Sequence, residues 1–191
     1  MTASANKSSP VPEGYSTVAP WIISRDTAGL LDFITAAFDA KETGRVPNAD
    51  GTIGHAEAII GDSVVMAFDA RPDWPDTPAF LRLYVEDGDA TFARAVAAGA
   101  TAVTEMTEMF WGDRVGRVRD PFGNLWWIQC RVAELTEEEA WERAGQPEFV
   151  QAMEYVQGAE LVQPLIPTRA DRESREKAPG PGNKLASPTA V

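Results

Sequence analysis

Residues 110–128 read FWGDRVGRVRDPFGNLWWI. The segment DPFGN is a turn signature, because Pro fixes φ and Gly accepts a positive φ, and the residues on both sides of it predict two paired strands. An earlier segment, GHAEAIIGDSVVMAFD at 54–69, predicts a second hairpin around Gly61 and Asp62. Two such units, about 60 residues apart, indicate an internal repeat.

The residues before each hairpin extend this repeat. Asp26 is placed to cap a helix in the first half, and Asp87 or Asp89 is placed to cap one in the second. An apolar run precedes each helix, and a further strand follows it. The sequence therefore predicts an α+β fold in which two βαβββ modules, 15–71 and 78–132, form a curved half-barrel sheet around a cleft.

The two modules make up one domain, 15–132, and the flanking segments differ in composition. Residues 133–163 predict helices, with a capping box that begins at Thr136. The segments 1–14 and 164–191 are poor in apolar side chains, so burial cannot offset the entropy cost of ordering them. We therefore predict C-terminal helices after the domain and a disordered segment at each end.

The charge balance and the cysteine count exclude several classes of protein. The chain has 17 Lys and Arg against 29 Asp and Glu, a net charge of −12, which disfavours a nucleic-acid partner. No apolar run is long enough to cross a membrane, and no secretory signal is present, so we expect no membrane partner. The single cysteine, Cys130, fits a reducing, cytoplasmic location, and one histidine leaves too few ligands for structural zinc.

Two stretches carry a resemblance to a known family. FWGDRVGRVRDPFGNLWWI resembles the C-terminal signature of the vicinal oxygen chelate superfamily, the group of glyoxalases, bleomycin-resistance proteins and ring-cleaving dioxygenases. GHAEAIIGDSVVMAFD resembles the PhnB-like branch of that superfamily. The resemblance implies two βαβββ modules whose sheets form a ligand cleft. It also implies a homodimer, because modules of this kind often pair between chains.

The resemblance also implies where a metal ion would bind. In the enzymes of the superfamily, four residues on the first, fourth, fifth and eighth strands hold a divalent ion in the cleft. The matching positions in this chain are on or beside Ala19, near Ala67, at Phe80 and at Trp127. None of these side chains can bind a metal ion, and neither can their immediate neighbours. We therefore predict no metal ion and no other cofactor.

The cleft is predicted to be lined by aromatic side chains with a few polar groups. Side chains two residues apart on a strand share a face, so an inward Phe80 brings Arg82 and Tyr84 with it. The predicted ligand-binding residues are Trp21, Phe80, Arg82, Tyr84, Trp111, Trp127 and Gln129. This lining favours a small organic ligand that is aromatic or planar.

Each of these assignments has a structural alternative. The aromatic side chains can fill the cleft as core, and Trp111 can pack in a loop instead of closing one end of the cleft as a lid. Arg82 can pair with Glu57 or Asp69 instead of meeting an anionic ligand.

His55 and Glu57 are candidate catalytic residues, because they lie two residues apart on one strand face and form a minimal general-base pair. Whether they face the cleft depends on the loop of the first hairpin. A two-residue loop turns them away from the cleft if Ala67 points into it, and a three-residue loop reverses this.

We favour a metal-independent small-molecule-binding protein of the glyoxalase/bleomycin-resistance type. The alternative is an enzyme of the superfamily, a lyase, isomerase or cyclase, in which His55 acts with Glu57 or Asp69 as an acid/base pair or as an unusual metal site. A third hypothesis is a scaffold or regulatory protein that interacts through the acidic helices of 133–160.

Overall fold

The computed structural model describes residues 9–161. The predicted disordered tail 164–191 and residues 1–8 of the predicted disordered N-terminus lie outside the described residues, and residues 9–14 contain neither helix nor strand.

The first module comprises β1 (Trp21–Ser24), α1 (Thr27–Phe38), β2 (Lys41–Pro47), β3 (Ile53–Ile60) and β4 (Ser63–Asp69). The second comprises β5 (Phe80–Tyr84), α2 (Gly88–Ala97), β6 (Thr101–Glu108), β7 (Asp113–Arg119) and β8 (Leu125–Arg131). Two helices follow, α3 (Glu137–Ala144) and α4 (Pro147–Gln157).

Side-chain caps fix where the helices begin. The carboxylate of Asp26 accepts a hydrogen bond of 2.9 Å from the backbone N–H three residues later, at the start of α1. Asp87 caps α2 in the same way, so the alternative cap, Asp89, is not used. The predicted capping box at Thr136 is present at the start of α3. These caps satisfy backbone donors that have no partner within their helix.

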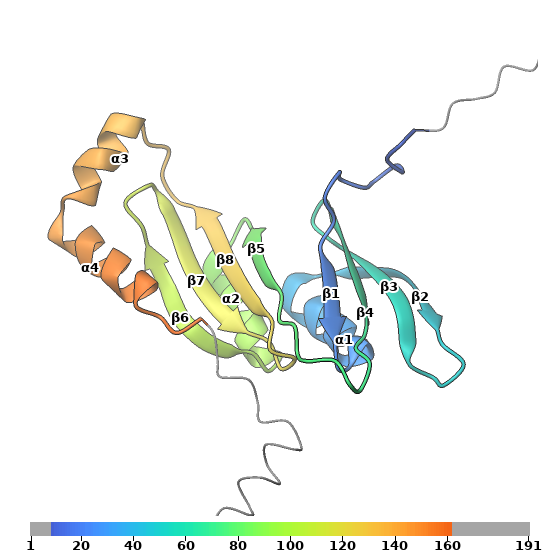
Figure 1. Cartoon of the computed structure of the whole chain (residues 1–191). Helices are drawn as coiled ribbons and strands as arrows, with labels where there is room; N and C mark the ends of the chain where they lie inside the picture. The colour runs from blue at the N-terminus through green and yellow to red at the C-terminus, as the bar shows by residue number, and fades with distance from the viewer. Residues whose placement is uncertain (1–8, 162–191) are drawn as a thin grey trace, which may run out of the picture. The chain divides into compact units, whose positions relative to one another are not determined.

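The two modules form two separate four-stranded sheets with the same topology. The strand orders are β1-β4-β3-β2 and β5-β8-β7-β6. In each sheet the first strand pairs in parallel with the last, and the other pairs are antiparallel. β1 and β5 are therefore edge strands, and the sheets are open (Figure 1). The predicted α+β fold of two βαβββ modules is confirmed.

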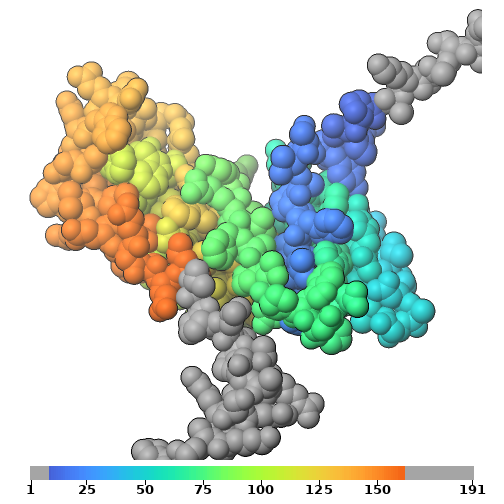
Figure 2. Space-filling view, viewed as in Figure 1, coloured from blue at the N-terminus to red at the C-terminus, as the bar shows by residue number. Residues whose placement is uncertain are grey.

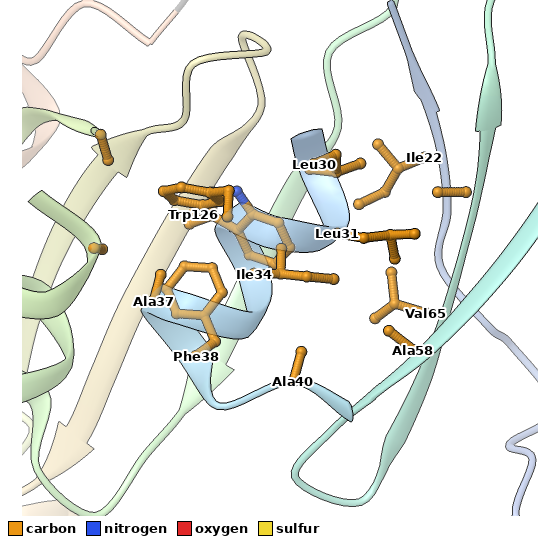
Figure 3. Close-up of a cluster of buried hydrophobic side chains, with 14 of the residues drawn as sticks. Ile22, Leu30, Leu31, Ile34, Ala37, Phe38, Ala40, Ala58, Val65 and Trp126 are labelled. Carbon is orange, nitrogen blue, oxygen red and sulfur yellow. The ribbon is translucent and has the colours of Figure 1, made fainter. Parts of the chain in front are cut away.

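The main core lies between the two sheets and includes the helices α1 and α2. Figure 3 shows α1 between Trp126 on one side and Ile22 and Val65 on the other. Phe38 of α1 contacts Trp126, with ring centroids 4.8 Å apart. We call the face of each sheet that points away from this core its outer face. Its residues are Trp21, His55, Glu57, Met66 and Phe68 on the first sheet, and Phe80, Arg82, Tyr84, Arg117, Arg119, Trp127 and Gln129 on the second.

The β3–β4 hairpin settles the register that the sequence left open. Ile60 pairs with Ser63, so the loop has two residues. Ala67 is buried in the core with α1, because small side chains on this side of β3 and β4 let the helix approach the sheet. The assignment of Ala67 to the cleft side of β4 is therefore wrong. His55 and Glu57 alternate with the core-facing residues and lie on the outer face.

The C-terminal helices lie beside the second sheet (Figure 1). Val156 of α4 packs with Met109 and Val115 in a second, smaller core. Its backbone carbonyl accepts a hydrogen bond of 2.6 Å from Arg117. α4 thus covers part of the outer face of the second sheet. Among residues 9–161, no helix is long and apolar enough to cross a membrane.

Candidate functional site

Along β5, the outer face of the second sheet alternates aromatic and basic side chains. Leu81 and Leu83 pack against the main core, so Phe80, Arg82 and Tyr84 point the other way. Phe80 is 59% exposed and Tyr84 is 71% exposed. Aromatic side chains this exposed, on an edge strand, are available to a ligand or to another protein surface.

Trp127 lies between two guanidinium groups on this face. Arg82 on β5 and Arg117 on β7 both pair with Trp127 on β8. Their guanidinium carbons lie 4.3 Å (Arg82) and 4.0 Å (Arg117) from the centroid of the indole ring. Both distances are in the range of a cation–π interaction, so the indole is held in place by both arginines.

Arg117 is a buried cation that sequence analysis did not identify. It is 4% exposed, and its Nε has no hydrogen-bond acceptor among the described residues. Burial, and to a lesser degree the charge of Arg82, lowers the pKa of Arg117. The register of the hairpin around DPFGN places Arg117 beside Trp127. Pairing the two strands from that turn would have predicted this position of Arg117 from the sequence.

Gln129 and Trp111 both donate hydrogen bonds to the buried carboxylate of Asp113. The Trp111 bond, from Nε1, measures 3.0 Å, and Arg131 donates to the other oxygen at 3.0 Å. Trp111 also packs against the smaller core, which matches its alternative as a packed loop residue. Gln129 is buried, and its Oε1 has no donor among the described residues.

Trp21 lies on the outer face of the first sheet and not beside the other predicted ligand-binding residues. It is 60% exposed, and its ring centroid is 5.1 Å from that of Phe68. Because the core lies between the sheets, Trp21 and the aromatic side chains of β5 occupy different faces. Strand alternation predicts which side chains share a face of one sheet, but not how two sheets are arranged.

A chain of hydrogen bonds joins Tyr15, Glu57 and His55 on the outer face of the first sheet. The Tyr15 hydroxyl donates to Oε2 of Glu57 (2.5 Å), and Nε2 of His55 lies 2.9 Å from Oε1 of Glu57. The bond from Tyr15, and then the one with His55, lowers the pKa of Glu57 and keeps its carboxylate ionised at neutral pH. An ionised Glu57 holds the proton of a neutral His55 on Nε2 and leaves Nδ1 as the basic nitrogen.

The surroundings of these hydrogen-bonded residues differ from the sequence expectation in two ways. Tyr15 was not predicted, because it precedes β1 and no local pattern marks it. Asp69 does not contact His55. Its carboxylate accepts hydrogen bonds from the backbone N–H groups of Thr27 and Ile53, both at 2.7 Å, so it orders the backbone instead. Nor does Arg82 form an ion pair with Glu57 or Asp69 among the described residues.

The metal positions of the superfamily do not fit a divalent ion in this chain. Phe80 and Trp127, at two of the positions that the resemblance implies, lie on β5 and β8 of the second sheet. Ala67 is in the core, and Ala19 precedes β1. Within residues 9–161, no group of three or more His, Cys, Asp and Glu side chains converges so that it could hold a metal ion.

A cavity of about 760 Å³ lies at the junction of the modules. It is bordered by β5, the start of α2, the end of α1 and the β3–β4 loop. Figure 2 shows a notch between the green β5 region and the blue β1 region. The lining includes Leu81 and Leu83 as well as Arg82 and Tyr84, so the cavity follows the open edge of β5 and not its outer face.

Comparisons with known proteins agree with this architecture. Residues 16–128 match the Glyoxalase/Bleomycin resistance protein/Dioxygenase superfamily. Uncharacterized proteins of Mycobacterium bovis and Mycobacterium tuberculosis are 40% identical over 133 residues, which cover 64% of this chain and 88% and 78% of theirs. The crystal structure of TioX from Micromonospora sp. ML1 is 28% identical with a TM-score of 0.51, and the match covers 63% of this chain and 100% of that one. A Pseudomonas aeruginosa protein, 21% identical, shares the fold with a TM-score of 0.52, over 61% of this chain and 98% of that one.

Proposed function

The chain belongs to the glyoxalase/bleomycin resistance protein/dioxygenase superfamily, and we propose that it binds a small organic molecule without a metal ion. The observation that carries this proposal is the environment of Trp127, which is at a position that the family resemblance assigns to a metal ligand. An indole between two guanidinium groups cannot coordinate an ion, but it holds the guanidinium groups of Arg82 and Arg117 in place as polar contacts for a ligand. We place this binding in the cytoplasm, because the single cysteine, Cys130, cannot form an internal disulfide.

We further propose that a second copy of the chain completes the binding cleft. Each copy presents two outer faces with exposed aromatic side chains, Trp21 on one and Phe80 and Tyr84 on the other. The edge strands β1 and β5 border these faces. When the first-sheet face of one copy turns toward the second-sheet face of the other, the predicted ligand-binding side chains line a single cleft. A two-fold dimer contains two such clefts.

Native mass spectrometry of the untagged protein, compared with its denatured mass, tests both parts. We expect a metal-free dimer that carries an organic adduct, and we expect Trp127→Ala to lose that adduct. Trp141→Ala is the control, because Trp141 is exposed on α3 and should leave the adduct in place. A chelator-removable metal ion in each cleft would contradict the metal-independent proposal, and a monomer would contradict the shared cleft.

The hydrogen bonds among Tyr15, Glu57 and His55 favour a second candidate function, acid/base catalysis. In this reading Nδ1 of His55 accepts a proton from the bound molecule and returns it to another atom of the same molecule, as in an isomerisation or cyclisation. We expect turnover of the bound molecule to be lost in His55→Gln, while the ligand still binds. Recovery of an unchanged ligand after long incubation with the wild-type protein would contradict catalysis.

A further inference from the structure

The ion pairs of the described residues leave out one group of arginines. Most arginine side chains in residues 9–161 form an ion pair with Asp or Glu. Arg82, Arg117 and Arg119 form none with a described residue, and all three lie on the outer face of the second sheet. The whole chain has 29 Asp and Glu against 17 Lys and Arg, so a shortage of carboxylates does not explain this. We call these three residues the arginine cluster.

Backbone carbonyls, and not carboxylates, satisfy the inner members of the arginine cluster. Arg117 donates to the carbonyl of Val156 (2.6 Å), and Arg119 donates to that of Leu161 (2.9 Å). Carbonyl groups satisfy N–H donors but do not neutralise the charge, and burial strengthens the remaining field. Arg82 is exposed and makes no hydrogen bond to a described residue, so its donors are the accessible ones of the three.

We propose that the arginine cluster is the anion subsite of the ligand cleft and that the ligand is a planar molecule carrying a carboxylate. This inference rests on the proposed function. Arg82 is the contact residue, because its planar fork of N–H donors matches a carboxylate. Arg117 and Arg119 strengthen the positive potential at that point. Phe80 and Tyr84 flank Arg82 on β5 and offer aromatic surface to the planar part of the ligand.

The electrostatics of Arg117 support this assignment. The guanidinium groups of Arg82 and Arg117 both lie over the indole ring of Trp127, and neither has a counter-ion among residues 9–161. Burial, and then the charge of Arg82, disfavour the protonated form of Arg117. A bound carboxylate offsets that repulsion.

Calorimetric titration of the full chain with naphthoate and with the neutral isostere naphthamide tests the subsite. Both probes have the same ring system, so the difference isolates the carboxylate. We expect naphthoate to bind more tightly and Arg82→Gln to weaken it roughly tenfold to a hundredfold, as for the loss of hydrogen bonds to a charged group. Naphthamide binding should change less than naphthoate binding in Arg82→Gln, and its retention also shows that the variant is folded.

Two further variants sharpen the test. Arg82→Lys keeps the charge but loses the planar fork, so naphthoate should bind it with intermediate affinity. Arg45→Gln is the matched control, because Arg45 is ion-paired on β2 and lies across from the core residue Ala56. It should bind both probes like the wild type.

The outcomes separate this inference from the proposed function. Equal affinity for the two probes, or a preference that survives in Arg82→Gln, would overturn the anion subsite and leave small-molecule binding in place. If Arg82 pairs with Glu57 of a second copy, its guanidinium is not free to bind a carboxylate, and the two probes should bind with equal affinity. Binding of neither probe by the wild-type protein would contradict the aromatic cleft as well.

Discussion

At the scale of single residues, Asp120 organises the turn between β7 and β8. One carboxylate oxygen accepts backbone N–H groups of Phe122 and Asn124 at 2.9 and 2.8 Å. The other accepts from the side chains of Asn124 (2.8 Å) and Trp126 (2.9 Å). Burial raises the pKa of Asp120, and the four donors oppose that rise. The turn anchors Trp126 in the core and so leaves the next residue, Trp127, on the outer face.

We expect Asp120→Asn to lower the free energy of unfolding by about 2–3 kcal/mol, because an amide replaces one acceptor oxygen with a donor that faces two other donors. Urea denaturation followed by tryptophan fluorescence measures the change. Asp62→Asn, in the exposed β3–β4 loop, is the control and should change stability by less than about 0.5 kcal/mol. Equal stabilities of the two variants would contradict the anchoring role of Asp120.

Single residues also show what the sequence could predict. Trp126 and Trp127 are neighbours with opposite environments, and strand alternation predicts this difference. The partner Arg117 was missed, because its burial depends on the pairing of β7 with β8 and on the covering helix α4. Tyr15 was missed for a similar reason, since only the fold brings it to Glu57.

At the scale of elements, Gly112 shapes the connection between β6 and β7. Its φ is +87°, and its carbonyl accepts hydrogen bonds of 2.9 Å from the backbone of both Val132 and Ala133. A Cβ at this position would lie 2.5 Å from the carbonyl oxygen of Ala133. This connection carries Trp111, so the backbone of Gly112 fixes where that side chain packs.

Gly112→Ala and Gly123→Ala separate the cost of a positive φ from the cost of a steric clash. Gly123 has φ +94°, and a Cβ at this position would have no neighbouring atom within 4 Å, so its substitution should cost about 1–2 kcal/mol. Gly112→Ala should cost a further 1–3 kcal/mol or so, because the backbone of Ala133 must move. Urea denaturation of both variants checks the difference, and a smaller loss for Gly112→Ala would contradict the clash.

The capping box of α3 should make that helix sensitive to acid. Hydrogen bonds from the backbone and the hydroxyl of Thr136 lower the pKa of Glu139. A lowered pKa in the folded state gives stability that is present above the unfolded value, about 4.3, and is lost as the pH falls through the folded value. We expect amide exchange in α3 to accelerate in acid for the wild type relative to Glu139→Gln, because this variant has no carboxylate at position 139 to protonate.

Glu138→Gln is the matched control for this measurement. Glu138 lies in the same first turn, and its side chain makes no hydrogen bond to a described residue. Comparing the variants at each pH removes the intrinsic pH dependence of exchange. Acid sensitivity that is abolished equally in Glu138→Gln and Glu139→Gln would point to the net charge of the turn and not to the capping box.

The elements themselves could be predicted closely, and the orientation of one of them could not. The caps and turns that delimit α1, α2 and α3 are local, so the sequence marks them. The face of β4 that meets α1 is not local. Ala67 is small enough to suit either a cleft or a helix contact, and only the packing of α1 on the sheet decides between them.

At the scale of the whole molecule, the repeated pattern predicts the two modules but not how they share a core. The helices lie between the sheets, so the two candidate sites, around Trp127 and around His55, face away from each other within one chain. A single cleft that uses both requires a second copy. The proposed dimer would bury the large aromatic side chains that are exposed on both outer faces of one copy.

Light scattering coupled to size-exclusion chromatography tests the arrangement directly. We expect a dimer for the wild type and a dimer dissociation constant raised roughly thirtyfold or more in Trp21→Glu, since aromatic anchors at interfaces contribute about 2 kcal/mol or more. Trp141→Glu is the matched control, because Trp141 on α3 is 66% exposed and Trp21 is 60% exposed. If Trp141→Glu dissociates the dimer and Trp21→Glu does not, the acidic helices α3 and α4 form the interface. The two outer faces then belong to separate sites, and the arginine cluster must bind its ligand without the first sheet.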